Sequence, residues 1–78
     1  MHRSRKRRRM VRERACLVCG TKPCDAHHYP VRVSQGGRDT LDNMVPLCRI
    51  HHSAWHDGEE WVVEMVAASA PLYFETLT

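Results

Sequence analysis

The residues most able to do chemistry in this chain lie in two short segments, 26–30 and 48–56. Together these segments hold five of the six histidines and one of the four cysteines of the 78-residue sequence. Imidazole and thiolate groups are the ligands that zinc and related ions prefer. A chain this short buries a small core, and small domains commonly add a structural metal. We therefore predict metal binding, and the spacing of the ligands indicates how they are divided.

One group of ligands combines a Cys-x-x-Cys pair with a Cys-x-x-His pair. Cys16 and Cys19 bracket a tight turn, and Cys48 and His51 have the same spacing. Closed, thiolate-rich, tetrahedral sites are characteristic of structural zinc, so we predict one structural Zn²⁺ on these four residues. Cys24 is an alternative fourth ligand, which would release His51 and make all four ligands thiolates. Two disulfides in a secreted domain are the competing interpretation of the four cysteines. The Cys-x-x-Cys spacing, which is half of a common zinc-binding pattern, argues against it.

The other histidines predict a second, more open site. His52 and His56 are four residues apart, which places both side chains on one face of a helix. His27 and His28 are adjacent, so in an extended strand they point to opposite faces. One of them can join His52 and His56 on an ion, and the other is left free as a candidate general base. Three imidazoles with open positions are a catalytic pattern, because the ion can still bind water or a phosphate oxygen.

A hairpin followed by a helix would bring these ligands together. We expect a strand over residues 24–29, a long loop over 31–42 with a glycine pair at its turn, and a second strand over 43–47. A helix over residues 48–56 would then carry the downstream histidines. This order predicts a small α+β domain, framed by the zinc knuckle.

We expect a further helix after the break at Asp57-Gly58. Asp57 is suited to cap its N-terminus, and Pro71 would stop it and leave a tail over residues 72–78. Its apolar stripe would pack on the core and contains Trp61, Val62, Met65 and Val66.

Positive charge is concentrated at the N-terminus. The net charge is +3, but eight of the twelve Lys and Arg residues lie within residues 1–14. Clustered guanidinium groups bind phosphate because they are planar, permanently charged and bidentate, although such runs also serve as localisation tags or RNA-binding tails. We predict a flexible basic arm over residues 1–14, a metal-binding core over 15–57, and a C-terminal helix and tail over 58–78. With no signal peptide and no transmembrane segment apparent, we expect a soluble, cytoplasmic protein that does not bind membranes.

In combination, these residues resemble the HNH endonuclease family, whose active site has the ββα-metal (His-Me finger) fold. The resemblance runs through His27-His28, Gly36-Gly37, Asn43 and His52-x-x-x-His56, inside the cysteine and histidine frame, over residues 15–57. The order of the histidines is similar to that in colicin nuclease domains. The frame of zinc ligands looks more like the small HNH proteins of bacteriophages.

The resemblance implies a metal-dependent DNA endonuclease of low sequence specificity that leaves 5′-phosphate and 3′-hydroxyl ends. By the resemblance, His28 is the general base, and Asn43 holds the loop after the first strand, which fixes how His28 points. His27, His52 and His56 are the implied ligands of one catalytic divalent ion, which could be Mg²⁺, Mn²⁺, Ni²⁺ or Zn²⁺.

We expect no separate DNA-recognition domain, so that arginines would supply most phosphate contacts. We predict this role for Arg7, Arg8, Arg9, Arg32, Arg38 and Arg49, and we expect Arg38 or Arg32 to reach the scissile phosphate. Resemblance to phage proteins predicts a bacterial host cell and a phage terminase or recombination protein as partner. The alternative function is a non-catalytic, zinc-containing nucleic-acid-binding accessory protein of a phage packaging or recombination machine. A binder of that kind should hold one zinc, whereas a nuclease should hold one zinc and a second divalent ion.

Overall fold

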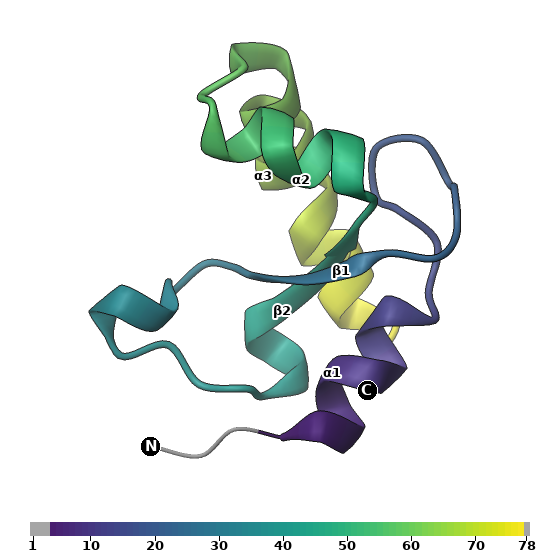
Figure 1. Cartoon of the computed structure of the whole chain (residues 1–78), viewed down its shortest axis with the longest axis vertical. Coiled ribbons are helices and arrows are strands. Elements are labelled where there is room, and N and C mark those ends of the chain that lie inside the picture. The colour runs from purple at the N-terminus through teal and green to yellow at the C-terminus, as the bar shows by residue number, and fades with distance from the viewer. Residues whose placement is uncertain (1–3, 78) are drawn as a thin grey trace.

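The structure, a computed structural model, describes residues 4–77 and consists of a short β-hairpin surrounded by three helices (Figure 1). The predicted class, a small α+β fold in which a β-hairpin is followed by a helix, is confirmed. Each predicted strand, and the helix after them, begins and ends within one residue of its expected bounds. In chain order the elements are α1 (Arg5–Arg12), β1 (Asp25–His28), η1 (Val33–Gln35), η2 (Leu41–Asn43), β2 (Met44–Leu47), α2 (Arg49–His56) and α3 (Glu60–Glu75).

The hairpin places the two adjacent histidines on opposite faces. β1 and β2 are antiparallel, with His27 opposite Val45 and His28 opposite Met44. α1 and α2 both contact the two strands and lie on either side of them in Figure 1. Because side chains alternate along a strand, His27 faces the rings of α2, and His28 faces the side on which α1 lies.

Glycine is required where the loop between the strands folds back on itself. Gly36 has a φ of +87°, a left-handed conformation that glycine adopts without steric cost. The amide of Gly37 donates to the carbonyl of Arg32 at 2.8 Å. A Cβ atom on Gly37 would lie 2.0 Å from the carbonyl oxygen of Val31, so no larger residue fits without backbone movement.

The structure differs from the flexible arm predicted for residues 1–14. Residues 5–12 form α1, whose first turn is capped by the hydroxyl of Ser4, which accepts the amide hydrogen of Arg7 at 3.1 Å. Val11 is fully buried and fixes the helix against the hairpin. A cap and one apolar anchor therefore order a segment that composition alone identifies as an arm. Residues 1–3 of that arm lie outside the described residues.

The C-terminal helix also differs from its prediction. Asp57 ends α2 as its C-cap instead of starting the next helix, because its amide continues the α2 ladder by donating to Ser53. Pro71 lies inside α3, which runs on to Glu75, so no tail begins at residue 72. The helix is held on the core on both sides of the proline, and this burial offsets the backbone hydrogen bond that proline cannot make. Its buried residues are Val62, Val66, Ala70 and Tyr73.

The expected apolar stripe of this helix is only half buried. Val62 and Val66 join the core, whereas Trp61 and Met65 are exposed to about half of their surface, 54% and 40%. The core itself lies between α3, β2 and the cysteine-rich turn before β1. Within residues 4–77, none of the helices has the length and apolar character needed to cross a bilayer.

Candidate metal centres and catalytic site

The cysteine-rich turn before β1 is held next to the start of α2. Its hydrogen bonds run from the amide of Gly20 to the carbonyl of Cys16 at 2.9 Å and from the amide of Leu17 to the carbonyl of Pro46 at 3.0 Å. Pro46 lies in β2, two residues before Cys48, which caps α2. The two halves of the predicted frame, distant in sequence, are thereby adjacent in space.

Four ligand atoms of this frame converge on one point. The sulfurs of Cys16, Cys19 and Cys48 and a ring nitrogen of His51 all lie within 4.8 Å of one another. The Sγ atoms of Cys19 and Cys48 are 3.7 Å apart, and Nδ1 of His51 is 3.2 Å from Sγ of Cys48. Two sulfurs bound to one tetrahedral zinc at about 2.3 Å would be about 3.8 Å apart. The donor set therefore fits a closed structural metal site, and all four cysteines are free of disulfides.

The geometry favours His51 over Cys24 as the fourth ligand. Cys24 Sγ donates a hydrogen bond to the carbonyl of Thr21 at 3.2 Å, and the thiol lies outside the group of converging atoms among residues 4–77. Burial raises the pKa of Cys24 to about 11, which keeps it a thiol. Hydrogen bonds from Thr21 instead lower the pKa of Cys19 to about 6, and the thiolate is the form that binds metal.

A second cluster is formed by His27 of β1 with His52 and His56 of α2. One ring nitrogen of each lies within 4.8 Å of the others, and the Nε2 atoms of His52 and His56 are 3.2 Å apart. Nε2 of His27 is buried and has no hydrogen-bond partner among the described residues. Burial, together with the neighbouring His52 and His56, lowers the pKa of His27 to about 3 and keeps the ring neutral. A buried, unpartnered imidazole nitrogen beside two others fits a metal ion.

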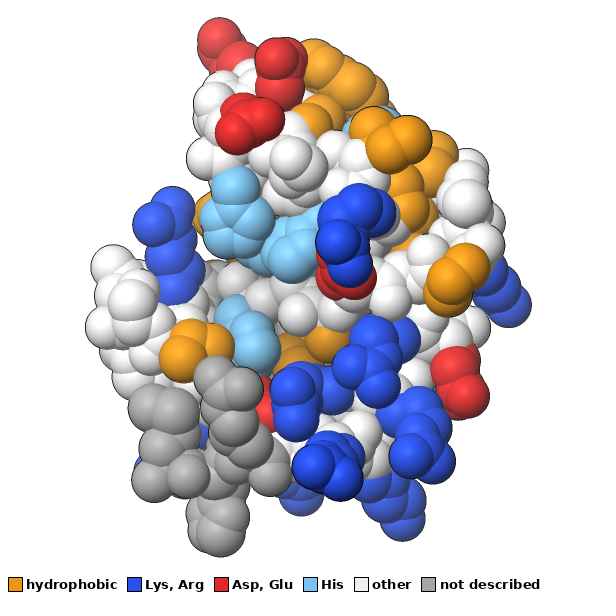
Figure 2. Space-filling model, in the orientation of Figure 1, with side chains coloured by type: hydrophobic (Ala, Val, Ile, Leu, Met, Phe, Trp, Pro, Cys, Tyr) orange, Lys and Arg blue, Asp and Glu red, His pale blue; other side chains and the backbone are white. Residues whose placement is uncertain are grey.

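This histidine cluster opens onto a hollow of about 340 Å³. Figure 2 shows the histidines around this hollow, with Lys and Arg side chains gathered below them over α1. The hollow is lined by Ala26, His27, His28, Arg32, Val33, Ser34, His52 and His56. The arrangement leaves room for a substrate beside the three imidazoles.

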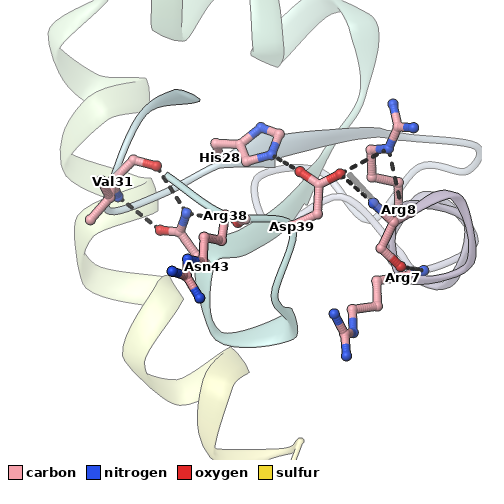
Figure 3. Close-up of polar contacts among 8 residues, drawn as sticks. Arg7, Arg8, His28, Val31, Arg38, Asp39 and Asn43 are labelled. Carbon is pink, nitrogen blue, oxygen red and sulfur yellow. Dashed lines mark hydrogen bonds and ion pairs between the residues drawn. The ribbon is translucent and has the colours of Figure 1, made fainter. Parts of the chain in front are cut away.

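His28 borders the same hollow but belongs to neither metal group. Its Nε2 lies 2.6 Å from Oδ1 of Asp39, in the loop between the strands (Figure 3). Asp39 is only 5% exposed. Burial alone would raise the pKa of Asp39, but hydrogen bonds from His28 and from the amide of Ser4 outweigh it and hold the pKa below its usual range.

Sequence reasoning missed Asp39 as a functional residue. It lies two residues after the glycine pair and is the only acid between Asp25 and Asp42 in the sequence. That isolation was an available signal. The pairing with His28 was not, because it depends on how the loop folds back over the hairpin.

Asp25 was missed as well. Its Oδ2 lies 2.9 Å from Nδ1 of His52 and accepts a hydrogen bond from Nε of Arg49 at 3.0 Å. Burial alone would raise the pKa of Asp25, but the contacts with His52 and Arg49 lower it below its usual range. The ionised carboxylate fixes the proton of His52 on Nδ1, which leaves Nε2 free to face His56. Carboxylates orient metal-binding histidines in this way in many proteins.

Asn43 ties the loop to the end of the hairpin. Its side-chain oxygen accepts the amide hydrogen of Val31 at 2.8 Å, and its nitrogen donates to the carbonyls of Val31 at 2.9 Å and Arg38 at 3.1 Å (Figure 3). The buried amide is thus satisfied within the loop, which also carries Asp39. Asn43 does not line the hollow and so acts on it through the loop.

The predicted DNA-contacting arginines fall into four places. Arg32 lines the hollow, with its guanidinium 5.2 Å from the ring centre of Trp55, whereas Arg38 borders a separate hollow around the glycine pair. Arg49 pairs with Asp25 and is largely exposed. On α1, Arg8 pairs with Asp39 at 3.3 Å, and its neighbours Arg7 and Arg9 are exposed. Of the two candidates for the scissile phosphate, Arg32 is therefore the one beside the histidines.

Comparison with known proteins gives one family. A family model described as HNH endonuclease matches residues 16–58, which is more than half of the chain. No curated protein and no solved structure matches the sequence. The matched region begins at the first cysteine and ends just after α2, so it contains both clusters and excludes α1 and α3.

Proposed function

This chain belongs to the HNH endonuclease family, and we propose that it is a metal-dependent DNA endonuclease that leaves 5′-phosphate and 3′-hydroxyl ends. The observation that carries the proposal is the different placement of the two adjacent histidines of β1. His27 joins two imidazoles of α2 with an unpartnered nitrogen, while the adjacent His28 stays outside that cluster at the edge of the same hollow. Such a pair supplies both an ion site and a separate base, which are the two requirements of hydrolysis.

His28 acts as the general base. Its Nε2 faces the carboxylate of Asp39, so that nitrogen carries the proton, and Nδ1 is the one left to accept a proton from the attacking water. The side chain of His28 is 17% exposed, which limits competing solvent while leaving the ring accessible from the hollow. Asn43 contributes by holding the loop of Asp39 in place.

His27, His52 and His56 would hold the catalytic divalent ion, for which Mg²⁺, Mn²⁺, Ni²⁺ and Zn²⁺ are the candidates. When bound, the ion would stabilise the charge that develops on the phosphate and on the departing 3′ oxygen. Asp25 prepares the site by fixing the tautomer of His52. The separate group of Cys16, Cys19, Cys48 and His51 would hold one structural Zn²⁺.

Arginine side chains would bind the DNA backbone on either side of the hollow. Arg32 is positioned beside the histidines, and the exposed basic residues of α1 extend the positive surface below them (Figure 2). Contacts of this kind read phosphates and carry little sequence information, which supports low specificity. A phage origin, a bacterial cytoplasm and a terminase or recombination partner stay predictions that rest on sequence resemblance alone.

Plasmid cleavage tests the proposal. Zinc-loaded protein should nick or linearise supercoiled plasmid in one or more of Mg²⁺, Mn²⁺, Ni²⁺ and Zn²⁺, and the new ends should carry a 5′-phosphate. His28→Ala should abolish cleavage while keeping its zinc and its circular dichroism spectrum. Gln35→Ala, an exposed change in the same loop, is the control. Wild-type protein that binds one zinc and DNA but never cleaves would support the non-catalytic binding module instead.

A further inference from the structure

Asp39 is a buried carboxylate that faces three donors. Its Oδ1 faces Nε2 of His28 at 2.6 Å, and its Oδ2 accepts the amide hydrogen of Ser4 at 2.8 Å and lies 3.3 Å from Nε of Arg8 (Figure 3). A carboxylate that is 5% exposed is costly unless it is paired, because it has lost its hydration. Two of the three partners that compensate this cost belong to the beginning of α1 rather than to the hairpin.

α1 is anchored firmly enough to act as a support. Val11 is fully buried, and the carbonyl of Arg12 accepts the amide hydrogen of Cys24 at 3.0 Å, one residue before β1. At the other end, Nε of Arg8 also donates to the carbonyl of Ser4 at 3.4 Å. The helix is therefore fixed at its C-terminal end to the hairpin and at its N-terminal end to Asp39.

From this arrangement we infer that α1 is part of the catalytic apparatus although it lies outside the matched family region, residues 16–58. Asp39 is a positioning residue for His28, and the Ser4 amide and Arg8 hold Asp39 in place. The inference rests on the proposed function, because it gives α1 a role in positioning His28, the proposed general base. The Asp39 carboxylate keeps the proton of His28 on Nε2 and holds the ring in one orientation.

The chain offers a matched pair of variants for the test. Arg8→Ala and Arg5→Ala each remove one positive charge from α1, but only Arg8 contacts Asp39, whereas Arg5 is exposed. In single-turnover cleavage, Arg8→Ala should lower the maximal rate about fivefold, the size expected for one partly exposed ion pair. Arg5→Ala should act mainly on the protein concentration that gives half the maximal rate. Equal effects of the two variants on both parameters would overturn the inference.

A second measurement does not depend on cleavage. In zinc-loaded protein at a pH where the ring is neutral, the ¹⁵N chemical shifts of His28 report which nitrogen carries the proton. Wild-type and Arg5→Ala protein should have the proton on Nε2, and Asp39→Ala should give a mixture of both tautomers. If Asp39→Ala does not fold, the same spectrum of Arg8→Ala decides, with a smaller shift towards the mixture. Unchanged tautomers in the folded variants would contradict the inference even if the protein proves to be a nuclease. The expected spectra would support the positioning of His28 by Asp39 and α1, and the cleavage rates then decide whether this positioning serves catalysis.

Discussion

At the scale of single residues, two acids place two chemically identical rings in different settings. Asp39 faces Nε2 of His28 on one side of β1, and Asp25 faces Nδ1 of His52 at the other side. The spacing of the histidines predicted that His52 and His56 share one face of a helix and that one of His27 and His28 could join them. The choice of His27 rested on the family resemblance. Neither acid was predicted, since each reaches its histidine only through the pairing of the strands or the folding of the loop.

The contact between Asp25 and His52 predicts the affinity of the histidine cluster for its ion. Asp25→Asn should weaken binding of Ni²⁺ to zinc-loaded protein by about 10- to 100-fold, because the amide no longer fixes the tautomer of His52. Isothermal titration calorimetry measures this affinity. Asp42→Asn removes an exposed acid away from the cluster and should bind Ni²⁺ as the wild type does. Equal affinities in all three proteins would show that Asp25 has no such role.

The position of Arg32 makes it the stronger candidate for the scissile phosphate. Arg32→Ala should slow single-turnover cleavage by about 100-fold, as expected when one donor to a developing charge is lost. Arg38→Ala should have a smaller effect, because Arg38 borders a different hollow. A larger loss of rate in Arg38→Ala than in Arg32→Ala would reverse the assignment.

At the scale of elements, the loop between the strands matters as much as the strands. Alternation and turn residues predicted β1, β2 and α2 to within a residue at each end. The helices at the two ends of the chain were predicted less well. The Ser4 cap and the buried Val11 order α1, a segment of strong helix formers that its charge alone identifies as an arm. α3 passes through Pro71 because tertiary burial outweighs local preference there.

Gly37 is the residue on which the loop conformation depends most. Gly37→Ala should lower the free energy of unfolding by about 2 kcal/mol, because its Cβ would lie 2.0 Å from the Val31 carbonyl oxygen and force the backbone apart. Urea denaturation of zinc-loaded protein measures the change. Ser53→Ala, on the exposed face of α2, should stay within about 0.5 kcal/mol of the wild type. Similar stabilities of the two variants would mean that the loop adapts without cost.

At the scale of the whole molecule, the cysteine and histidine frame joins parts that the small core cannot hold alone. The core brings cysteines of the turn together with Cys48 and the buried face of α3. The frame was predictable from spacing, since two ligand pairs of this kind close one tetrahedral site. The orientation of the basic helix over the catalytic side was not predictable, because charge patterning locates a cluster along the chain but not in space.

Loss of the metal from this frame should unfold the chain. Cys48→Ser, or a chelator added to wild-type protein, should remove the cooperative thermal transition, because binding and folding share one free energy in small metal domains. Cys24→Ser should keep the metal, since its hydroxyl can replace the thiol in the hydrogen bond to Thr21. The thiolate absorption of Co²⁺-substituted protein measures directly whether each variant still binds the metal through its cysteines. Retained absorption in Cys48→Ser, or its loss in Cys24→Ser, would assign the ligands differently.

The most direct test of the central claim is the single-turnover cleavage rate of a labelled DNA duplex by wild-type protein and by His28→Ala. Both proteins should first be shown to hold the same zinc and to bind the same divalent ion at the histidine cluster. We predict a rate at least about 100-fold lower for His28→Ala, the size expected for the loss of a general base. A variant that cleaves as fast as the wild type, or a wild-type protein that does not cleave with any of the four ions, would contradict the account.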